Sequence, residues 1–450
     1  MAVLLFILFA AALFITIRKR MSAGKLLFIV ILAGIVLRFG YMLYTPFFIR
    51  GHDVGKLDDY GHLAYIYRLF NLEGLPETTA NQFYHPPFAQ IAGALTSKIC
   101  ALLTGIENLD TIFQSARLVP CFASCALLIV SCRLFDAFGF SRRVKVIALT
   151  VIAFHPTFIL LSASINNDML MIFFMTTALL YTVRWYKEPT YKNILLLALS
   201  IGSAMSTKFS GALIAVLTAA VFLIVFIHYI RSKKAADLIY QFAAFALICF
   251  PLGLWYHIRN LKLFGQPIGY VAKISTDSAL YVGNVPFAER FFTFSLPDML
   301  SSLYCNPFTD FRLWEYTVKC ALFGEFTFSA KHDGFAAVLI VSSLILIVLS
   351  LCAMIWFLFF DRKKNKLAVI SLASLWALLM LSFVYFNVKY PFGCTMDFRY
   401  IVPTVITGAA FLGLLSDKLQ DRRQLYNGLF VSLAVILGIF CVSAAGFFIV

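Results

Sequence analysis

Charged residues are scarce in this sequence. They make up 13% of the 450 residues, whereas soluble domains have about 25%, and hydrophobic residues account for 61%. Acidic residues are the scarcer charge, with 22 aspartates and glutamates against 37 lysines and arginines. This composition excludes an ordinary soluble globular protein and indicates an integral membrane protein.

Cysteine pairs with metal-ligand spacing are absent. The ten cysteines are scattered, mostly within apolar segments, and no CxxC pattern occurs. Isolated cysteines in apolar surroundings are usually small buried side chains. We therefore expect neither a disulfide framework nor a zinc site built from thiolates. The sequence identifies no cofactor and leaves open a divalent metal ion bound by other ligands.

The formal net charge is +15, which in a soluble protein would favour nucleic-acid binding. Here the lysines and arginines form short clusters between apolar runs, such as SRRVK, RSKK and DRKKNK. Cytoplasmic loops of membrane proteins have this distribution. We therefore expect the lipid bilayer as a partner and exclude nucleic acid.

Apolar runs long enough to cross a bilayer recur along the chain. About 20 helical residues cross a hydrocarbon core of about 30 Å, and a helix satisfies its own backbone there. The predicted fold is an all-α polytopic bundle of about 12 transmembrane helices. The expected spans are residues 2–17, 26–44, 114–135, 146–161, 169–186, 194–207, 211–230, 238–257, 336–360, 367–386, 400–416 and 427–449.

Hydropathy alone does not define how three segments lie in the membrane. Residues 2–17 have no positive charge before them and no convincing cleavage site, so we expect a retained helix and not a signal peptide. Residues 86–103 are apolar but interrupted by Gly, Ser and Lys98, and we expect them to lie along or dip into the membrane. Residues 194–211 fit either two short helices or one kinked helix.

The basic clusters define the expected orientation. If they are cytoplasmic, both termini and the long loop after the second span face outward, and most acidic residues gather on that outer face. We therefore expect a multi-pass protein, provisionally of a bacterial cytoplasmic membrane, with its active site facing outward. The expected parts are an extra N-terminal helix and basic loop (1–25), a membrane core (26–257) that includes the outer loop 46–112, an outer cap loop (258–335) and C-terminal helices (336–450).

The first outer loop carries three aspartates in an otherwise hydrocarbon-rich chain. A carboxylate just outside the membrane can act as a general base for an acceptor hydroxyl. Asp53 follows the span that ends at Tyr44 closely, and Asp58 and Asp59 come shortly after it. The alternative is that these carboxylates only solvate the loop.

Histidines flank a short amphipathic segment of the same loop. GHLAYIYRLF (residues 61–70) has apolar residues at helical spacing, which predicts a helix at the membrane interface. His62 lies at its start, and His85 precedes a pair of prolines. Either histidine alone is more often structural than catalytic.

Further charges are expected at the outer ends of other helices. Asp168 follows two asparagines and suits a helix N-terminus, which by itself explains that carboxylate. Lys208 and Arg399 also lie beside helix ends. Cations at a membrane edge often extend toward water without a specific ligand, yet two near an acidic loop can bind a lipid phosphate.

Seven segments together resemble the GT-C glycosyltransferases, and within them the protein O-mannosyltransferase and aminoarabinose-transferase branch, often called family 39. The resemblance covers residues 26–416 and rests on the order and spacing of the motifs relative to the helices. The segments are HDVG, DDYGHLAYIYRLFNLEGLP, QFYHPPF, FHPTFILLSASINNDMLMIFF, STKFSG, WYHIRNLKLFGQP and MDFRYIVP.

The resemblance implies a polyprenyl-phosphate-linked sugar as donor, a lipid, glycan or protein acceptor on the outer side, and an acidic residue of the first outer loop as base. Asp58 and Asp59 have the family-like spacing to Gly74, whereas Asp53 has the family-like distance from the preceding helix, so the base stays open among them. The catalytic candidates are Asp53, Asp58, Asp59 and Asp168. The candidates for substrate binding are His62, His85, Lys208, Arg259, Arg399 and Tyr400.

The predicted function is an inverting glycosyltransferase that uses a polyprenyl-phosphate sugar. One rival is a polysaccharide polymerase or ligase with a lipid-diphosphate donor. The other is a membrane transporter, which would place ionisable residues in the middle of the membrane on broken helices, often within internal repeats. The acidic residues gather at one surface and no repeat is visible, so the enzyme is favoured.

Overall fold

The structure is a computed structural model that describes residues 23–49, 55, 57–231, 234–361, 365–421 and 423–449. The regular secondary structure of these residues is helical, and their only extended pairing is one isolated bridge between Tyr281 and Phe392. The predicted all-α class is confirmed for this part of the chain. The predicted span 2–17 and Asp53 lie outside the described residues.

The chain forms two compact units. Unit 1 comprises residues Met1–Tyr41, Phe138–Leu160 and Ile274–Val450, and unit 2 comprises Met42–Ala137 and Leu161–Lys273. Each unit therefore combines segments that are far apart in the sequence.

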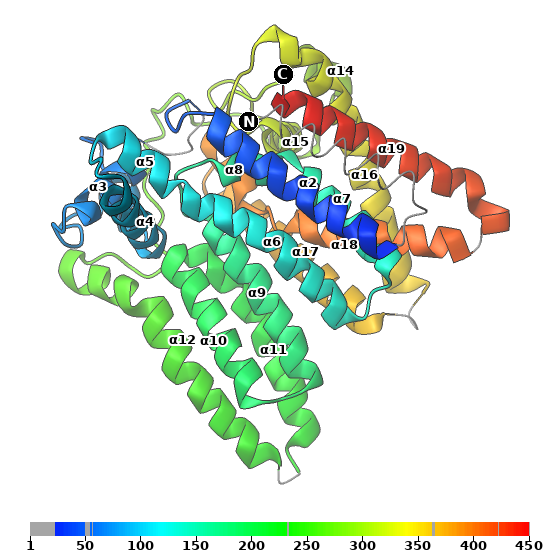
Figure 1. The fold of residues 1–450 in the computed structure, drawn as a ribbon, viewed down its shortest axis with the longest axis horizontal. Coiled ribbons are helices and arrows are strands. Elements are labelled where there is room, and N and C mark those ends of the chain that lie inside the picture. Colours follow the sequence, from blue (N-terminus) through cyan, green and yellow to red (C-terminus); the bar gives the residue numbers. More distant parts are fainter. Residues whose placement is uncertain are drawn as a thin grey trace. The chain divides into compact units, whose positions relative to one another are not determined.

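Unit 2 contains four long helices side by side in Figure 1. Small residues permit the closest of these approaches: a Cβ atom on Gly202 would lie 3.0 Å from the Leu252 side chain, and one on Gly253 would lie 3.0 Å from Met205. Close backbone approach at glycine is common between membrane helices. The four helices are α9 (Asp168–Lys187), α10 (Tyr191–Thr207), α11 (Leu213–Tyr229) and α12 (Lys234–Phe264).

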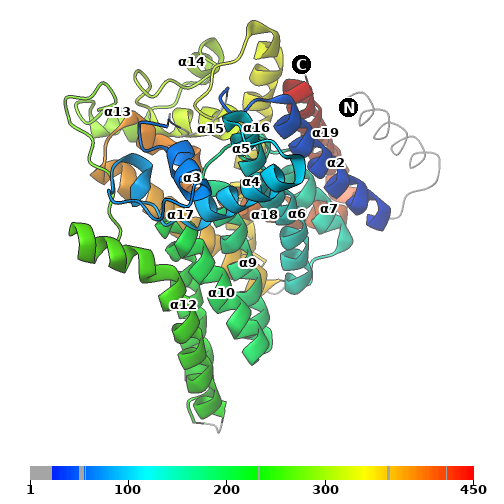
Figure 2. The same ribbon diagram turned by 60° about the vertical axis from the view of Figure 1, so that its left-hand side comes forward.

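The remainder of unit 2 is the loop after α2 (Ala23–Tyr44), named the first outer loop for its predicted orientation, and the helices that follow. Helix α3 (His62–Phe70) packs against α4 (Phe88–Thr104) and α5 (Leu109–Ala116), as Figure 2 shows, and α6 (Leu118–Phe138) comes next. The predicted amphipathic helix is present, and its apolar residues Leu63 and Ile66 are buried in a protein core. Helices α4 and α5 cover its apolar face, and the position of α3 at the membrane interface stays a prediction.

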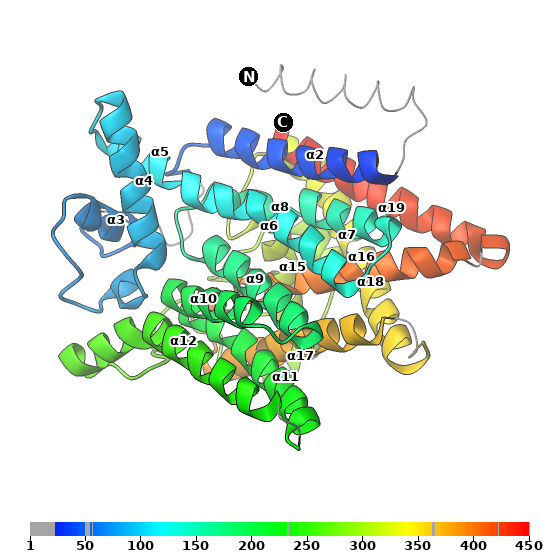
Figure 3. The same cartoon turned by 60° about the horizontal axis from the view of Figure 1, so that its bottom comes forward.

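Unit 1 is built around contacts of α7 (Arg142–Phe154) with α18 (Thr404–Asp421), and of α16 (Asp333–Phe359) with α19 (Arg423–Ile449). Helices α16 and α19 lie side by side in Figure 3. The boundary between the units falls near the ends of α2 and α8 (Pro156–Ser162), and unit 1 contains α2 up to Tyr41 and α8 up to Leu160. Unit 1 also contains α13 (Phe287–Phe292), α14 (Leu296–Ser301), α15 (Leu313–Phe323) and α17 (Lys366–Lys389).

A sharp break separates α7 from α8, which meet at 52°. Pro156 has no N–H, so it cannot donate to the carbonyl of Ile152 four residues earlier. Arg38 of α2, fully buried, donates to Ile152 O at 3.0 Å and to Ala153 O at 2.8 Å. The guanidinium thus satisfies the carbonyls that the break exposes and holds His155 at the bend.

Eight of the described helices are long and apolar enough to cross a membrane, or nine if α7 and α8 count as one broken span. The protein is an integral multi-pass membrane protein. Two expected spans do not meet the same criteria, because α10 has only 17 residues and α18 ends in the charged residues Asp417, Lys418 and Asp421. With the undescribed span 2–17, these account for the difference from about 12.

Three further expectations have structural outcomes. Residues 194–211 lie in the single helix α10 and the 3₁₀ turn that follows it, Phe209–Ala212, and not in two α-helices. Most of residues 86–103 belong to α4, a 17-residue helix too short to count as a span. The expected start of the cap loop at 258 falls inside α12, which continues to Phe264.

Candidate functional site

A buried ion pair joins the ends of two helices in unit 2. Asp168 begins α9 and Lys208 follows the last residue of α10, and Lys208 Nζ lies 2.5 Å from Asp168 Oδ1. The Asp168 side chain is 1% exposed and that of Lys208 is 14% exposed. In such surroundings each charge is stable only because the other is present.

The turn before α9 explains why the carboxylate sits there. Asn166 Oδ1 accepts a hydrogen bond from the Asp168 backbone N–H at 3.1 Å, and Asn167 is the N-cap residue. A carboxylate in the first turn also interacts favourably with the helix dipole. The predicted helix-start role of Asp168 is confirmed, and the contact with Lys208 is an addition that helix capping does not require.

Two amide side chains near this turn are incompletely satisfied. The Nδ2 atoms of Asn166 and Asn167 are buried and have no hydrogen-bond partner among the described residues. Asn166 lines a cavity of about 10 Å³ together with His62 and Gln90. That volume holds no more than about one water molecule, so it is not a sugar pocket.

The predicted histidines lie close together in the first outer loop. His62 is buried and its Nδ1 is 3.0 Å from Gln90 Nε2, and the rings of His62 and His85 stack with centroids 6.2 Å apart. The ring of Tyr84 packs on His85, with a centroid separation of 4.0 Å. These contacts fix the histidines within the loop, and their contact with a substrate stays a prediction.

Tyrosines and Arg259 tie the first outer loop to α12. Tyr65 donates to the Tyr256 hydroxyl at 3.0 Å, and Tyr256 donates to Phe83 O at 2.8 Å. Burial, reinforced by Tyr256, raises the pKa of the Tyr65 hydroxyl well above its usual value. Arg259 donates to Pro76 O at 2.7 Å. The loop therefore has a defined path across the end of α12.

The described aspartates of the loop differ in their contacts. Asp59 Oδ1 accepts from the Gly61 N–H at 3.0 Å, immediately before α3, and Asp59 O accepts from Asn81 Nδ2 at 2.7 Å. Asp58 is exposed. Asp59 thus has a structural role at the start of α3.

Arg399 and Tyr400 belong to unit 1, within the short 3₁₀ segment Phe398–Tyr400. Arg399 Nε lies 2.5 Å from Asp397 Oδ2, and Asp397 Oδ1 accepts from the Arg399 backbone N–H at 2.8 Å. Asp397 is fully buried and also accepts from Cys320 Sγ at 3.1 Å. The Tyr400 ring packs on Phe386, with centroids 5.0 Å apart.

Each candidate phosphate-binding cation therefore already contacts a carboxylate within its own unit. The sequence did not lead us to predict Asp397 as the partner of Arg399, although Asp397 lies only two residues before it in the segment Asp-Phe-Arg. It also missed Gln90, Tyr65 and Tyr256, because nothing in their local sequence distinguishes them from core residues. Among the described residues, no three His, Cys, Asp or Glu side chains gather as ligands for a metal ion.

Part of the chain matches a family model. Residues 106–263 match the family model of dolichyl-phosphate-mannose-protein mannosyltransferases, and this range contains Asp168, Lys208 and Arg259. No curated protein matches the sequence.

Solved structures resemble the whole fold. The oligosaccharyltransferase of Archaeoglobus fulgidus in the apo form is 13% identical with a TM-score of 0.52, covering 96% of this chain and 56% of the archaeal chain. The archaeal AglB in complex with an inhibitory peptide and a dolichol-phosphate is 14% identical with a TM-score of 0.51, covering 95% and 55%. ArnT from Cupriavidus metallidurans bound to undecaprenyl phosphate is 13% identical with a TM-score of 0.40, covering 89% and 80%.

This chain spans just over half the length of the archaeal proteins. At such low identity, the archaeal likeness shows a shared fold and no more. The predicted resemblance to membrane glycosyltransferases is confirmed by the family match. Residues 106–263 are similar to the dolichyl-phosphate-mannose-protein mannosyltransferase family, in a chain with the fold of the archaeal oligosaccharyltransferase.

Proposed function

We propose that this protein is a glycosyltransferase that moves a sugar from a polyprenyl-phosphate-linked donor to an acceptor on the outer face of the membrane. The observation that carries the proposal is the buried Asp168–Lys208 pair, because it places a carboxylate and a cation at helix ends inside the segment that matches the mannosyltransferase family. The archaeal AglB with the same fold was solved with a dolichol-phosphate, which is consistent with a polyprenyl phosphate as leaving group.

The reaction requires one displacement with inversion. The acceptor hydroxyl oxygen attacks the anomeric carbon, the bond from that carbon to the phosphate oxygen breaks, and polyprenyl phosphate leaves with the bonding electrons. A carboxylate takes the hydroxyl proton as the new bond forms. The phosphate is already a reasonable leaving group, so the remaining catalysis consists of positioning the reactants and stabilising charge.

Asp53 is our preferred base. It follows the second predicted span closely, and Asp59 already accepts a backbone hydrogen bond at the start of α3. Asp58 and Asp59, both exposed in the same loop, are the alternatives if the family-like spacing to Gly74 selects the base.

The other candidates have proposed roles that follow from their chemistry. Lys208 and Arg399 are each proposed as a cation that neutralises charge on the lipid phosphate, and Asp168 holds the Lys208 ammonium group in place. Arg259 shapes the outer loop through Pro76 O. His62, His85 and Tyr400 contact the sugar or the acceptor.

The test is a transfer assay with the full-length protein in lipid nanodiscs. The protein is offered a panel of polyprenyl-phosphate sugars with lipid, glycan and peptide acceptors, and release of polyprenyl phosphate is measured. We expect release with at least one donor, and Asp53→Asn protein serves as the matched control. Release only from a polyprenyl-diphosphate oligosaccharide would favour the polymerase or ligase instead. Movement of an intact solute into sealed vesicles, without cleavage of any donor, would favour the transporter.

A further inference from the structure

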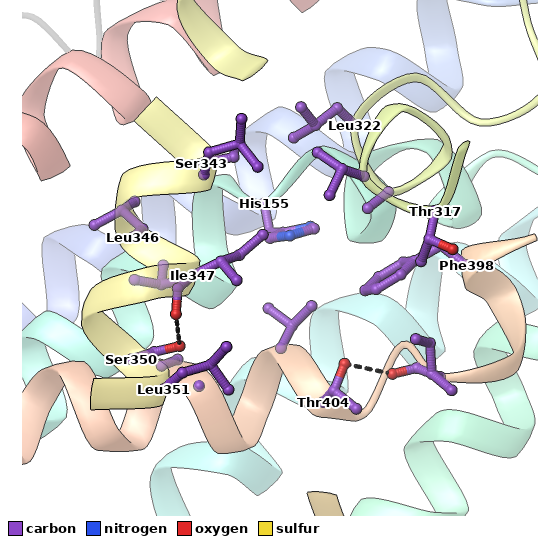
Figure 4. Close-up of a pocket in the computed structure, with 18 of the residues that line it drawn as sticks. His155, Thr317, Leu322, Ser343, Leu346, Ile347, Ser350, Leu351, Phe398 and Thr404 are labelled. Carbon is purple, nitrogen blue, oxygen red and sulfur yellow. Dashed lines mark hydrogen bonds between the residues drawn. The ribbon is translucent and has the colours of Figure 1, made fainter. Parts of the chain in front are cut away.

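Unit 1 contains an apolar chamber of about 490 Å³. Its walls come from the bend between α7 and α8 and from α15, α16, α17, α18 and α19. Figure 4 shows His155 near the middle of this chamber, with Leu346 and Ile347 of α16 on one side and Phe398 on the other. Three of these helices, α16, α17 and α19, are long and apolar enough to cross a membrane. The surroundings that can supply an occupant are therefore lipid.

Three hydroxyls of the chamber wall are used by the protein itself. Thr317 donates to Leu313 O at 2.6 Å, Ser350 donates to Ile347 O at 2.9 Å, and Thr404 donates to Ile401 O at 2.7 Å. Because each hydroxyl already donates its proton to a backbone carbonyl, this part of the wall presents a mainly apolar surface to a ligand.

Two buried polar atoms in the chamber wall are different. His155 Nδ1 and Ser343 Oγ have no hydrogen-bond partner among the described residues. A buried polar group without a partner is destabilising, and such a group in a native structure calls for a bound partner or another explanation. A ligand with one oxygen function on an otherwise apolar chain would satisfy these atoms.

The position of His155 is enforced by the backbone. The break at Pro156 directs this residue out of the helical path, and Arg38 holds the broken carbonyls. The imidazole stacks on Phe398 with centroids 6.1 Å apart and approaches Phe440 at 6.2 Å. These contacts fix the ring at the chamber without saturating its Nδ1 atom.

We propose that this chamber binds one linear acyl chain of a membrane lipid, with an ester or hydroxyl oxygen of that lipid bonded to His155 or Ser343. A cavity of about 490 Å³ lies within the range of about 300–1,000 Å³ that is typical of pockets for one small ligand, and a single acyl chain is a ligand of that size. A polyprenyl chain has several times as many carbons, so we expect most of such a chain to lie outside the cavity.

Photo-crosslinking in nanodiscs tests the proposal without any sugar donor, so its result is independent of the proposed transferase activity. One probe is a phospholipid with a diazirine in the middle of an acyl chain. The other is polyprenyl phosphate with a diazirine near the end of its chain. We expect the acyl probe to label Ile347 and Val405, which line the chamber, and the polyprenyl probe to leave them unlabelled. Labelling by the polyprenyl probe alone, or no labelling of these residues, overturns the proposal.

Matched variants separate chamber binding from general lipid contact. Ser343→Trp places a large ring in the chamber and should lower acyl labelling of Val405 about tenfold, since it occupies the volume that the chain needs. Val348→Trp lies on the same helix, where Val348 is 57% exposed, and should leave labelling unchanged. Equal labelling in the two variants contradicts the proposal.

A second variant guards against misfolding of Ser343→Trp. Gly408→Leu fills the chamber from α18, where an added Cβ would have only ordinary contact with Ser350 Oγ, at 3.4 Å. It should reduce labelling in the same way.

The polar contact has its own test. The variant His155→Phe retains an aromatic ring but removes the nitrogen, so it should weaken binding of an ester-bearing lipid more than binding of a plain alkane probe. No difference between these two ligands removes the polar part of the proposal.

Discussion

At the scale of single residues, each deeply buried carboxylate of the candidate site lies beside a cation. Asp168 contacts Lys208, and Asp397 contacts Arg399, both at 2.5 Å. An isolated charge in such an environment is very costly, whereas a paired one is tolerated. A substitution at one partner therefore affects stability as well as function, and experiments on these residues need charge-neutral controls.

The identity of the base is the first prediction. Asp53→Asn keeps the shape of the side chain but removes its basicity, so turnover should fall about 100-fold while donor binding is retained. Asp59→Asn should have a smaller effect on turnover, because Asp59 Oδ1 already accepts the Gly61 N–H. Steady-state kinetics with a fixed donor measures both. Full activity in Asp53→Asn together with inactivity in Asp59→Asn would reverse the assignment and leave the proposed reaction intact.

The role of Arg399 is the second prediction. If its guanidinium binds the lipid phosphate, Arg399→Gln should weaken donor binding strongly, since removing one partner of a buried charge contact costs about 2–5 kcal/mol. The measurement is the dissociation constant for a polyprenyl-phosphate sugar.

The double variant Arg399→Gln, Asp397→Asn separates the two roles of this arginine. It contains no unpaired buried charge, so thermal stability should return toward that of the parent while donor affinity stays low. Recovery of donor affinity in the double variant would show that Arg399 acts only through Asp397 and the local fold.

At the scale of secondary-structure elements, the Asp168–Lys208 pair connects the start of α9 with the end of α10. The third prediction is that Lys208→Met destabilises the protein by about 3–5 kcal/mol, because it leaves Asp168 buried with an unpaired charge. Adding Asp168→Asn should recover much of this loss. Thermal unfolding of the single and double variants in the same detergent gives the coupling energy.

Activity provides the second readout for the same cycle. The neutral double variant should be folded and inactive if the pair serves the reaction. A folded double variant with parental activity would mean that the pair only joins the two helices.

At the scale of the whole molecule, the orientation predicted from the basic clusters is the fourth prediction. A cysteine introduced at Glu77, whose side chain is 89% exposed, should react with a membrane-impermeant maleimide added from outside. A cysteine at Lys366, the last residue of the basic cluster DRKKNK, should react only after the membrane is permeabilised.

The native cysteines set the background of that experiment. Cys352 is exposed in the described structure, so labelling is compared with a parent in which it is replaced by serine. Reaction of both new cysteines from the same side would contradict the predicted orientation and the outward placement of the site.

The sequence by itself determined the class of protein, the positions of most membrane helices and the family resemblance. Hydropathy is a property of a continuous stretch of chain, so spans such as α16 and α17 could be read directly. The helical periodicity of residues 61–70 predicted α3, and the asparagines before Asp168 predicted the start of α9. The predicted number of spans included short apolar runs such as the 17-residue α10, and the length of such a run does not by itself show whether it crosses the membrane.

Only the tertiary structure decided which side chains meet. Asp168 and Lys208 are separated by 40 positions, and Tyr65 and Tyr256 by 191, so no local pattern pairs them. The covering of α3 by α4 and α5, and the chamber beside His155, likewise depend on packing between distant segments. The hydropathy of successive residues indicates whether a segment prefers water or hydrocarbon. Ion pairs and cavities depend instead on the distances between side chains after the helices have packed.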